Sequence, residues 1–263
     1  MEAALQALLA ADPARLTIGY ALLFARVGAV LLLLPGFADD AVPGRIRLLI
    51  ALGVAAGLHG LLAPALTPAV AAGLASDGAL ARALLTELLT GLLLGSVLRL
   101  MFLAISIAGS IISLQVGLTS ALVNDPSAGG QVPILARFIS VSALLVCLAL
   151  NVHHLWIAAM VDSYATFPAG TLPPAADFAQ LAIRAATGAM ALGLSLAAPI
   201  VIYGIVFNGA LGLAARLAPQ LQIFFIGQPL AILFGLALIA ATLGTTLSVF
   251  ADHMARWARA LSG

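Results

Sequence analysis

Four ionisable side chains lie within or at the edge of long apolar runs, and they are the residues most able to carry a function. They are Arg26, Glu87, Arg99 and Asp162. A charge in the hydrocarbon core of a membrane costs at least about 2.5 kcal/mol, so such groups commonly mark a pathway or an ion pair. Two roles are open. The charges line a substrate path, or Arg26 or Arg99 pairs with Glu87 across a helix interface and fixes assembly.

Residues that would support enzyme chemistry are poorly arranged. His153 and His154 are adjacent, so on a helix their side chains point about 100° apart, and no carboxylate follows three or four residues later. Gly109-Ser110 lacks the G-x-S-x-G context of a serine nucleophile, and a deep hydroxyl commonly bonds to its own helix. We therefore expect no catalytic residue, no metal site and no cofactor, and an intramembrane enzyme ranks third among the functions considered.

A polar stretch, residues 115–126, interrupts the longest apolar segment. It reads Gln-Val-Gly-Leu-Thr-Ser-Ala-Leu-Val-Asn-Asp-Pro. Irregular backbone at membrane depth persists only where protein or a water-filled cavity satisfies its polar groups. The stretch therefore predicts either the lining of a pore or cavity, or an ordinary surface loop that ends in an Asx-Pro turn. The residues alone do not separate the two.

Six apolar segments must position these residues, because a helix needs about 20 apolar residues to cross a bilayer. They cover residues 16–37, 46–66, 80–123, 133–161, 181–217 and 221–250. We expect the second to end at Pro64 and Pro68, and the third to bend or break at its Ser and Gly positions. The last two should form a helical hairpin that turns at residues 218–220, and residues 167–176 should be an exposed, extended loop.

Composition assigns the chain to the membrane. Hydrophobic residues make up 63% of the 263 positions and charged residues 8%, against roughly 25% charged in soluble domains. Ala and Leu dominate and alternation is absent, which predicts an all-α protein and not a sheet. The net charge of +1 is too small to attract nucleic acid. An amphipathic ending with His253, Arg256 and Trp257 favours a cytoplasmic C-terminus.

Collinear motifs carry a resemblance over nearly the whole chain. They include Arg26-Val27-Gly28, Glu87 with Gly91 and Gly95, Gln115-Val116-Gly117-Leu118, Asp125-Pro126, Ser163-Tyr164, Pro168-Ala169-Gly170, Asn208-Gly209-Ala210-Leu211-Gly212-Leu213, Arg216, Pro219-Gln220-Leu221-Gln222-Ile223-Phe224 and Gly227-Gln228-Pro229-Leu230. In these residues the chain resembles the FliR family, the R subunit of the flagellar type III export gate, whose injectisome counterpart is the T subunit.

The resemblance implies a subunit of a closed export pore in the bacterial inner membrane, within the flagellar basal body. Its partners would be P-type (FliP) and Q-type (FliQ) gate subunits, the B-type (FlhB) switch protein, membrane lipid and the unfolded flagellar proteins that pass through. Residues 1–180 would be P-like and 181–263 Q-like. The alternatives are the injectisome T subunit and a secondary transporter with broken helices, although the inverted repeats of the latter are not visible.

The resemblance also implies roles for three groups of residues. The pore plug or gate would comprise Gln115, Gly117, Leu118, Thr119, Ser120, Ala121, Leu122, Asp125 and Pro126. The charges that serve assembly would be Arg26, Glu87, Arg99 and Arg216. The hairpin and family motif would include Asn208, Gly212, Pro219, Gln220, Phe224 and Pro229. Many family members have aromatic residues in the plug, whereas Leu118 and Leu122 here imply a softer, aliphatic constriction.

Overall fold

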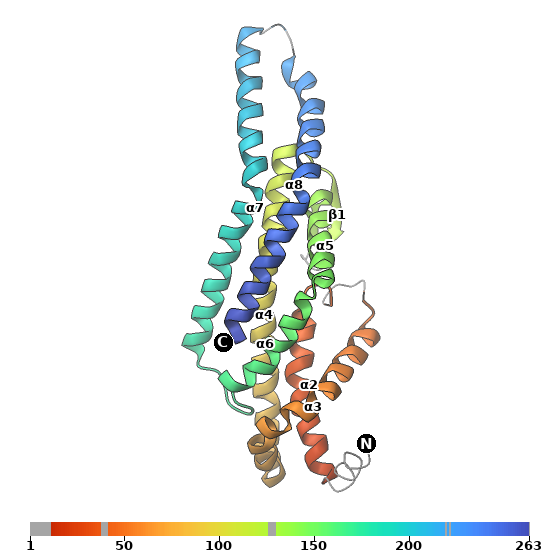
Figure 1. The fold of residues 1–263 in the computed structure, drawn as a ribbon, viewed down its shortest axis with the longest axis vertical. Helices are drawn as coiled ribbons and strands as arrows, with labels where there is room; N and C mark the ends of the chain where they lie inside the picture. Colours follow the sequence, from red (N-terminus) through yellow and green to blue (C-terminus); the bar gives the residue numbers. More distant parts are fainter. Residues whose placement is uncertain (1–11, 38–41, 126–129, 219, 221, 263) are drawn as a thin grey trace. The chain divides into compact units, whose positions relative to one another are not determined.

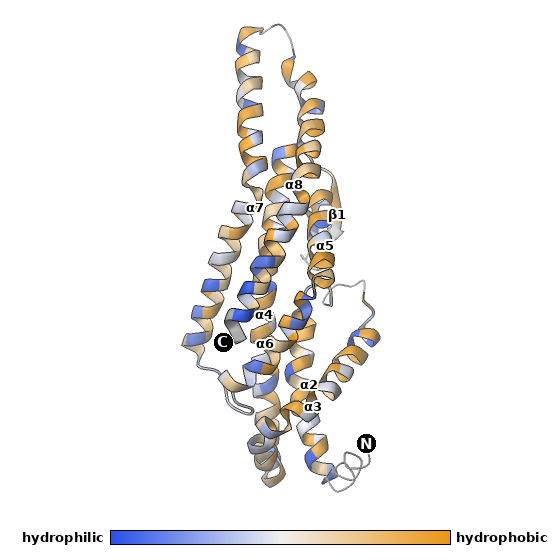
Figure 2. Cartoon of the chain, viewed as in Figure 1, coloured by the Kyte–Doolittle hydropathy of each residue, from blue (hydrophilic) through white to orange (hydrophobic). Residues whose placement is uncertain are grey.

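The computed structural model describes residues 12–37, 42–125, 130–218, 220 and 222–262. In chain order the elements are α2 (Pro13–Leu33), α3 (Gly44–Ala75), α4 (Asp77–Val116), β1 (Leu122–Asp125), β2 (Gly130–Pro133), α5 (Ile134–Ala149), α6 (Val152–Thr166), α7 (Ala175–Leu217) and α8 (Ile223–Ser262) (Figure 1). In the described part of the chain, five helices are long and apolar enough to cross a membrane, and the bent α5–α6 pair would make a sixth. Hydrophobic residues run along these helices (Figure 2), which confirms the all-α membrane class.

Two compact units make up the chain. One contains Met1–Arg99, His154–Ala182 and Ala258–Gly263, and the other contains Leu100–His153 and Ile183–Trp257. The first unit holds α2, α3, the beginning of α4 and most of α6. The second holds the end of α4, the β1–β2 hairpin, α5 and most of α7 and α8. The division into a P-like part (1–180) and a Q-like part (181–263) stays a prediction.

Helix α2 is the central element of the first unit. The Asp12 carboxylate caps it by accepting from the Ala14 N–H at 3.0 Å, and Pro13 occupies the first turn, where a missing N–H costs nothing. Glycines on α4 let the two backbones approach closely. A Cβ on Gly91 would collide with the carbonyl oxygen of Arg26, and one on Gly95 would lie 3.0 Å from that of Val30.

Helix α3 continues through both prolines at which it was expected to end. It runs from Gly44 to Ala75, with Pro64 and Pro68 in its interior. A proline removes one backbone hydrogen bond but does not end a helix whose surroundings supply other partners. The carbonyls that lose a backbone donor are those of Gly60 and Pro64, four residues before each proline. The Thr67 hydroxyl donates to the neighbouring carbonyl of Ala63 at 3.0 Å.

Helix α4 was expected to bend or break at its serines, and it does not. It is a single helix from Asp77 to Val116. Its polar side chains bond inward: the Ser110 hydroxyl donates to Ser106 O at 2.9 Å, and the Ser113 hydroxyl donates to Gly109 O at 2.7 Å. Gly109 serves packing, since a Cβ there would lie 2.8 Å from the Cα of Ala136 on α5. The irregular backbone therefore begins only at Gly117.

The fourth apolar segment, expected to be one span, is two helices. Helices α5 and α6 are bent by 75° at a short break, where Asn151 has a φ of 59°. Asparagine is the non-glycine residue that best tolerates this left-handed conformation. Before α5, β1 and β2 pair antiparallel, with Val123 opposite Val132. The sequence did not predict this short hairpin.

Helices α7 and α8 lie side by side in the second unit and form the predicted hairpin (Figure 1). The Tyr203 hydroxyl on α7 donates to the carbonyl of Ala231 on α8 at 2.8 Å. The rings of Phe207 and Phe234 meet edge to face, 6.5 Å apart. Pro219, at the predicted turn, lies outside the described residues. Helix α8 continues to Ser262 and includes the predicted amphipathic ending.

Candidate functional site

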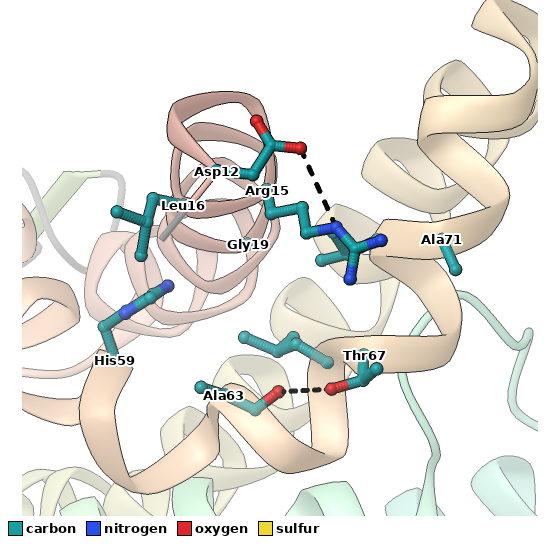
Figure 3. A pocket seen from close by; sticks show the side chains of 10 residues that line it. Asp12, Arg15, Leu16, Gly19, His59, Ala63, Thr67 and Ala71 are labelled. Carbon is teal, nitrogen blue, oxygen red and sulfur yellow. Dashed lines mark hydrogen bonds and ion pairs between the residues drawn. The ribbon is translucent and has the colours of Figure 1, made fainter. Parts of the chain in front are cut away.

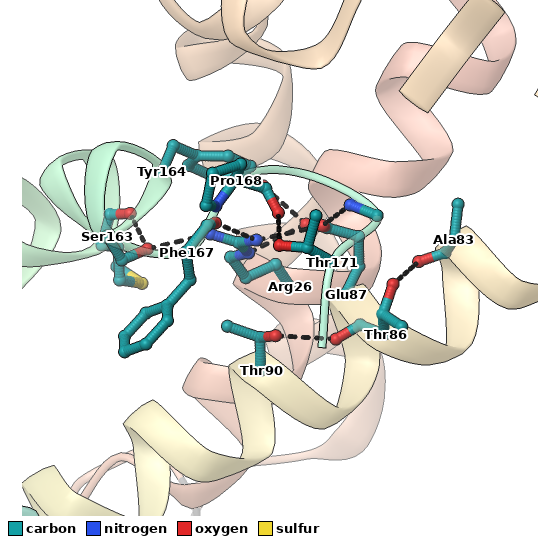
Figure 4. A network of polar contacts seen from close by, with 12 residues as sticks. Arg26, Ala83, Thr86, Glu87, Thr90, Ser163, Tyr164, Phe167, Pro168 and Thr171 are labelled. Carbon is teal, nitrogen blue, oxygen red and sulfur yellow. Dashed lines mark hydrogen bonds and ion pairs between the residues drawn. The ribbon is translucent and has the colours of Figure 1, made fainter. Parts of the chain in front are cut away.

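A buried ion pair between α2 and α4 is the most polar site in the described core. The Nε of Arg26 lies 2.8 Å from Oε2 of Glu87, and Nη2 donates to Oε1 at 3.0 Å (Figure 4). The two side chains are 1% and 0% exposed. This two-pronged geometry is the strongest arrangement available to an arginine and a carboxylate. Of the two partners considered for Glu87, the structure selects Arg26.

A turn after α6 completes the coordination of both charges. Arg26 also donates to the Ser163 hydroxyl at 3.2 Å and to the carbonyl of Phe167 at 3.0 Å. Glu87 accepts from the Tyr164 hydroxyl at 3.2 Å and from the Gly170 N–H at 3.0 Å. The guanidinium stacks over the Tyr164 ring, 3.7 Å from its centroid. The network joins α2, α4, α6 and the turn at 167–170 within the first unit.

The turn at 167–170 corrects the expectation of an exposed, extended loop at 167–176. Much of that segment is exposed, but its first residues fold back onto the ion pair. Glycine suits position 170 for two reasons. Its φ of 75° is a left-handed conformation that side chains disfavour, and a Cβ there would lie only 3.3 Å from the Cβ of Ala69. The resemblance marks Ser163, Tyr164 and Gly170, but their spacing gave no sign that they would coordinate Arg26 and Glu87.

The remaining charges lie outside this network. Arg99 on α4 and Arg216 at the end of α7 are exposed, and Asp162 on α6 is half-buried. An arginine that is exposed in one subunit becomes buried only if a partner covers it. The assembly role of Arg99 and Arg216 therefore stays a prediction.

The predicted plug begins where α4 ends. Gly117 has a φ of 85°, its N–H donates to Leu114 O at 3.2 Å, and the Leu118 N–H donates to Ser113 O at 2.9 Å. This pair of bonds is a Schellman motif, which requires the left-handed glycine. Leu118 is half-buried, whereas Thr119, Ser120 and Ala121 are exposed.

Leu122 is 47% exposed and begins β1, which ends at Asp125. Gln115 is half-buried in the last turn of α4. Pro126 lies outside the described residues. The structure thus places an irregular, largely exposed turn at 117–121. The pore plug at 115–126 stays a prediction.

The motif residues of the hairpin have mixed environments. The Asn208 amide donates to Gly204 O on its own helix at 2.9 Å, Gly212 has open space around it, and Gln220 is exposed. Pro229 lies inside α8 near its start, where Phe224 belongs to the first turn. The hairpin and family-motif assignments of these residues stay predictions.

A cavity of about 570 Å³ lies between α2 and α3 in the first unit (Figure 3). Its polar groups are few. The Arg15 guanidinium lies 3.8 Å from the Asp12 carboxylate, the Thr67 hydroxyl is used by Ala63 O, and the His59 imidazole faces Gly19. Among the described residues, no group of three or more His, Cys, Asp or Glu side chains could hold a metal ion. The side chains described around the cavity do not place a nucleophile beside a general base.

Among the described residues, five helices of membrane-crossing length define an integral membrane protein of the helical class. Its first unit holds a buried ion pair, and an irregular turn follows α4 in the second unit. Residues 17–257 match the family described as "Bacterial export proteins, family 1", and the chain belongs to this family.

Curated relatives agree with the family match. A flagellar biosynthetic protein FliR of Caulobacter vibrioides is 41% identical over 233 residues, which are 89% of this chain and 91% of the relative. The FliR proteins of Escherichia coli K12 and Bacillus subtilis 168 are 41% and 35% identical, over 58% and 51% of this chain and 58% and 52% of their own lengths. The long, collinear resemblance predicted from the motifs is confirmed.

Proposed function

We propose that this chain is the R-type subunit of the flagellar type III protein export gate in the bacterial inner membrane. The observation that carries the proposal is the match to an export-protein family over residues 17–257, with a FliR relative that aligns along nearly its whole length. The relatives named above are flagellar, which disfavours the injectisome T subunit and a secondary transporter. The chain would catalyse no reaction and would take its driving force from other components.

The surface of the hairpin supports assembly with other subunits. Large apolar side chains of α7 and α8 are exposed, among them Ile202 at 62%, Val206 at 66% and Phe225 at 77%. Such faces are covered in the membrane by lipid or by other helices. In the proposal they meet P-type (FliP) and Q-type (FliQ) subunits, and the B-type (FlhB) switch protein covers the cytoplasmic side, where the C-terminus would lie.

The proposed gate is the plug at 115–126, through which unfolded flagellar proteins pass when it yields. Two features support it. The turn at 117–121 interrupts helices of membrane-spanning length, and its exposed backbone would need a cavity or protein around it at membrane depth. Leu118 and Leu122 would exclude water as a hydrophobic constriction. The proposal also divides the chain into a part that resembles a P subunit, residues 1–180, and a part that resembles a Q subunit, residues 181–263.

Copurification tests the proposal. A tagged chain, expressed with the P-type, Q-type and B-type proteins of its own bacterium and extracted in mild detergent, should bring down all three in one complex. The matched control is the same tag on an unrelated helical membrane protein. A monodisperse chain that is stable alone and leaves the three behind would contradict the gate assignment and favour a transporter.

A further inference from the structure

Residues 115–117, the last two residues of α4 and the glycine that follows them, each contact α7 or α8 in the second unit. The Gln115 side chain fills the space above Gly204 on α7: its Cδ lies 2.9 Å from where a Cβ on Gly204 would stand, and its Oε1 is closer still. Val116, which is 0% exposed, lies 2.7 Å from the same point on Gly235 of α8. The Gln228 amide of α8 lies against Gly117, where any side chain would displace it.

One hydrogen bond spans α7 and α8 at the level of these contacts. Tyr203 precedes Gly204, and its hydroxyl donates to the carbonyl of Ala231, which lies between Gln228 and Gly235 on α8. The three contacts and this bond therefore form one clamp, defined by Tyr203, Gly204, Gln228 and Gly235. If the two helices separated here, Val116 and Gly117 would lose their partners on α8.

The clamp reaches the irregular turn through a short, rigid path. The Schellman bonds fix the Leu118 N–H to Ser113 O and the Gly117 N–H to Leu114 O, so the start of the turn moves with the end of α4. Beyond Leu118, the residues Thr119 to Ala121 are exposed, and the far end of the turn is held separately, by the Ile134 N–H that donates to Ala121 O at 2.8 Å. The position of Leu118, at the near end of the turn, is thus set mainly at Gln115, Val116 and Gly117.

We propose that Tyr203 and Gln228 are positioning residues that lock the 117–121 turn to the α7–α8 pair, so that loosening this pair releases the turn. This rests on the proposed function, in which the turn is part of the plug. A partner subunit or a passing polypeptide that moves α7 against α8 would then open the gate without touching Leu118. The coupling is a property of this chain's own helices.

Cysteine accessibility in the assembled complex tests the clamp. Leu118→Cys is introduced into a Cys147→Ala background, because Cys147 is the chain's one cysteine and is buried. The rate of its modification by a charged, membrane-impermeant methanethiosulfonate reagent is measured in proteoliposomes. Tyr203→Phe should raise this rate by roughly threefold to tenfold, because one net hydrogen bond is lost. Gln228→Ala, which removes the side chain that lies against Gly117, should raise it as well.

Tyr20→Phe is the matched control. The Tyr20 hydroxyl also donates to a backbone carbonyl, that of Leu52, at 2.8 Å, but it joins α2 to α3 in the first unit. The control should leave the rate at position 118 unchanged. Tyr20→Phe and Tyr203→Phe both keep the aromatic ring, so the complex should still assemble. If Tyr203→Phe nevertheless lowers the complex yield, Gln228→Ala, at an exposed side chain, decides whether the clamp holds the turn.

The outcomes separate the clamp from the plug. Rates in Tyr203→Phe and Gln228→Ala that match the Tyr20→Phe control overturn the clamp, even if deleting residues 119–121 makes the complex leak ions. Faster modification in both clamp variants supports the clamp, and it does so even if the deletion produces no leak and the plug assignment fails.

Discussion

At the scale of single residues, the Arg26–Glu87 pair shows how a membrane protein keeps charges in its core. Each charge is costly to bury alone, but here both receive several hydrogen bonds from side chains and from the backbone of the 167–170 turn. Such a network fixes the register of the elements that contribute to it. It is therefore better suited to hold α2, α4 and α6 together than to conduct a substrate.

Removing one charge of the Arg26–Glu87 pair should destabilise the chain more than removing both charges. Glu87→Leu or Arg26→Leu leaves an unpaired buried charge, which costs about 3–5 kcal/mol, whereas Arg26→Met with Glu87→Met leaves no charge. We expect each single variant to lose most of the monodisperse chain after mild heating in detergent, measured by size-exclusion chromatography. The double variant should lose less.

Arg82→Leu on the exposed face of α4 is the control for this series and should behave like the unaltered chain. Single variants that are as heat-resistant as Arg82→Leu would show that the network does not stabilise the fold.

One of the two candidate partners of Glu87, Arg99, could have been excluded by its distance along the helix. Arg99 lies 12 residues beyond Glu87, and because both belong to the continuous helix α4, the two are about 18 Å apart along its axis. They therefore cannot pair within one chain. Gly170 was not predictable as a partner, because it lies in the segment 167–176 that resembled an exposed loop. Ser163 and Tyr164 follow the fourth apolar segment, and their spacing gave no sign of this contact.

At the scale of elements, apolar length predicted the helices well and their interruptions poorly. Prolines 64 and 68 and the serines of α4 resemble breaks, but both helices continue through them. The serine hydroxyls find acceptors on their own helix, so they need no break in it to be satisfied. The break that does occur, between α5 and α6, is marked in the sequence by a single residue, Asn151. The β1–β2 hairpin is too short to produce a visible alternation, which explains why it was missed.

Asn151 should control the bend between α5 and α6. A left-handed residue costs about 1–2 kcal/mol when it carries an ordinary side chain, and more when it is β-branched. Asn151→Gly should therefore keep the stability of the chain, whereas Asn151→Val should lower it, as measured by thermal unfolding in detergent. The exposed neighbour Leu150 provides a control, since Leu150→Val lies at a negative φ of −86°. Equal melting of Asn151→Val and Leu150→Val would exclude a role for the left-handed backbone.

At the scale of the whole molecule, we propose that this chain helps to close a pore. Its helices of membrane-crossing length expose apolar faces, and helix α4, from Asp77 to Val116, leads directly into the irregular turn. A hydrophobic constriction excludes ions because water leaves a narrow apolar passage, and yet it yields to a polypeptide. In the proposed gate, closure would therefore depend on the aliphatic side chains around the turn.

Ion conductance of the assembled complex in planar bilayers tests whether the turn and its leucines close the pore. Deleting Thr119 to Ala121, or replacing Leu118 and Leu122 by Gly, should produce a steady leak at unchanged complex abundance, whereas Thr171→Ala, outside the plug, should not. Conductance in the deletion complex equal to that of the unaltered complex, with equal amounts of each subunit present, would contradict the plug and leave 115–126 as a surface loop.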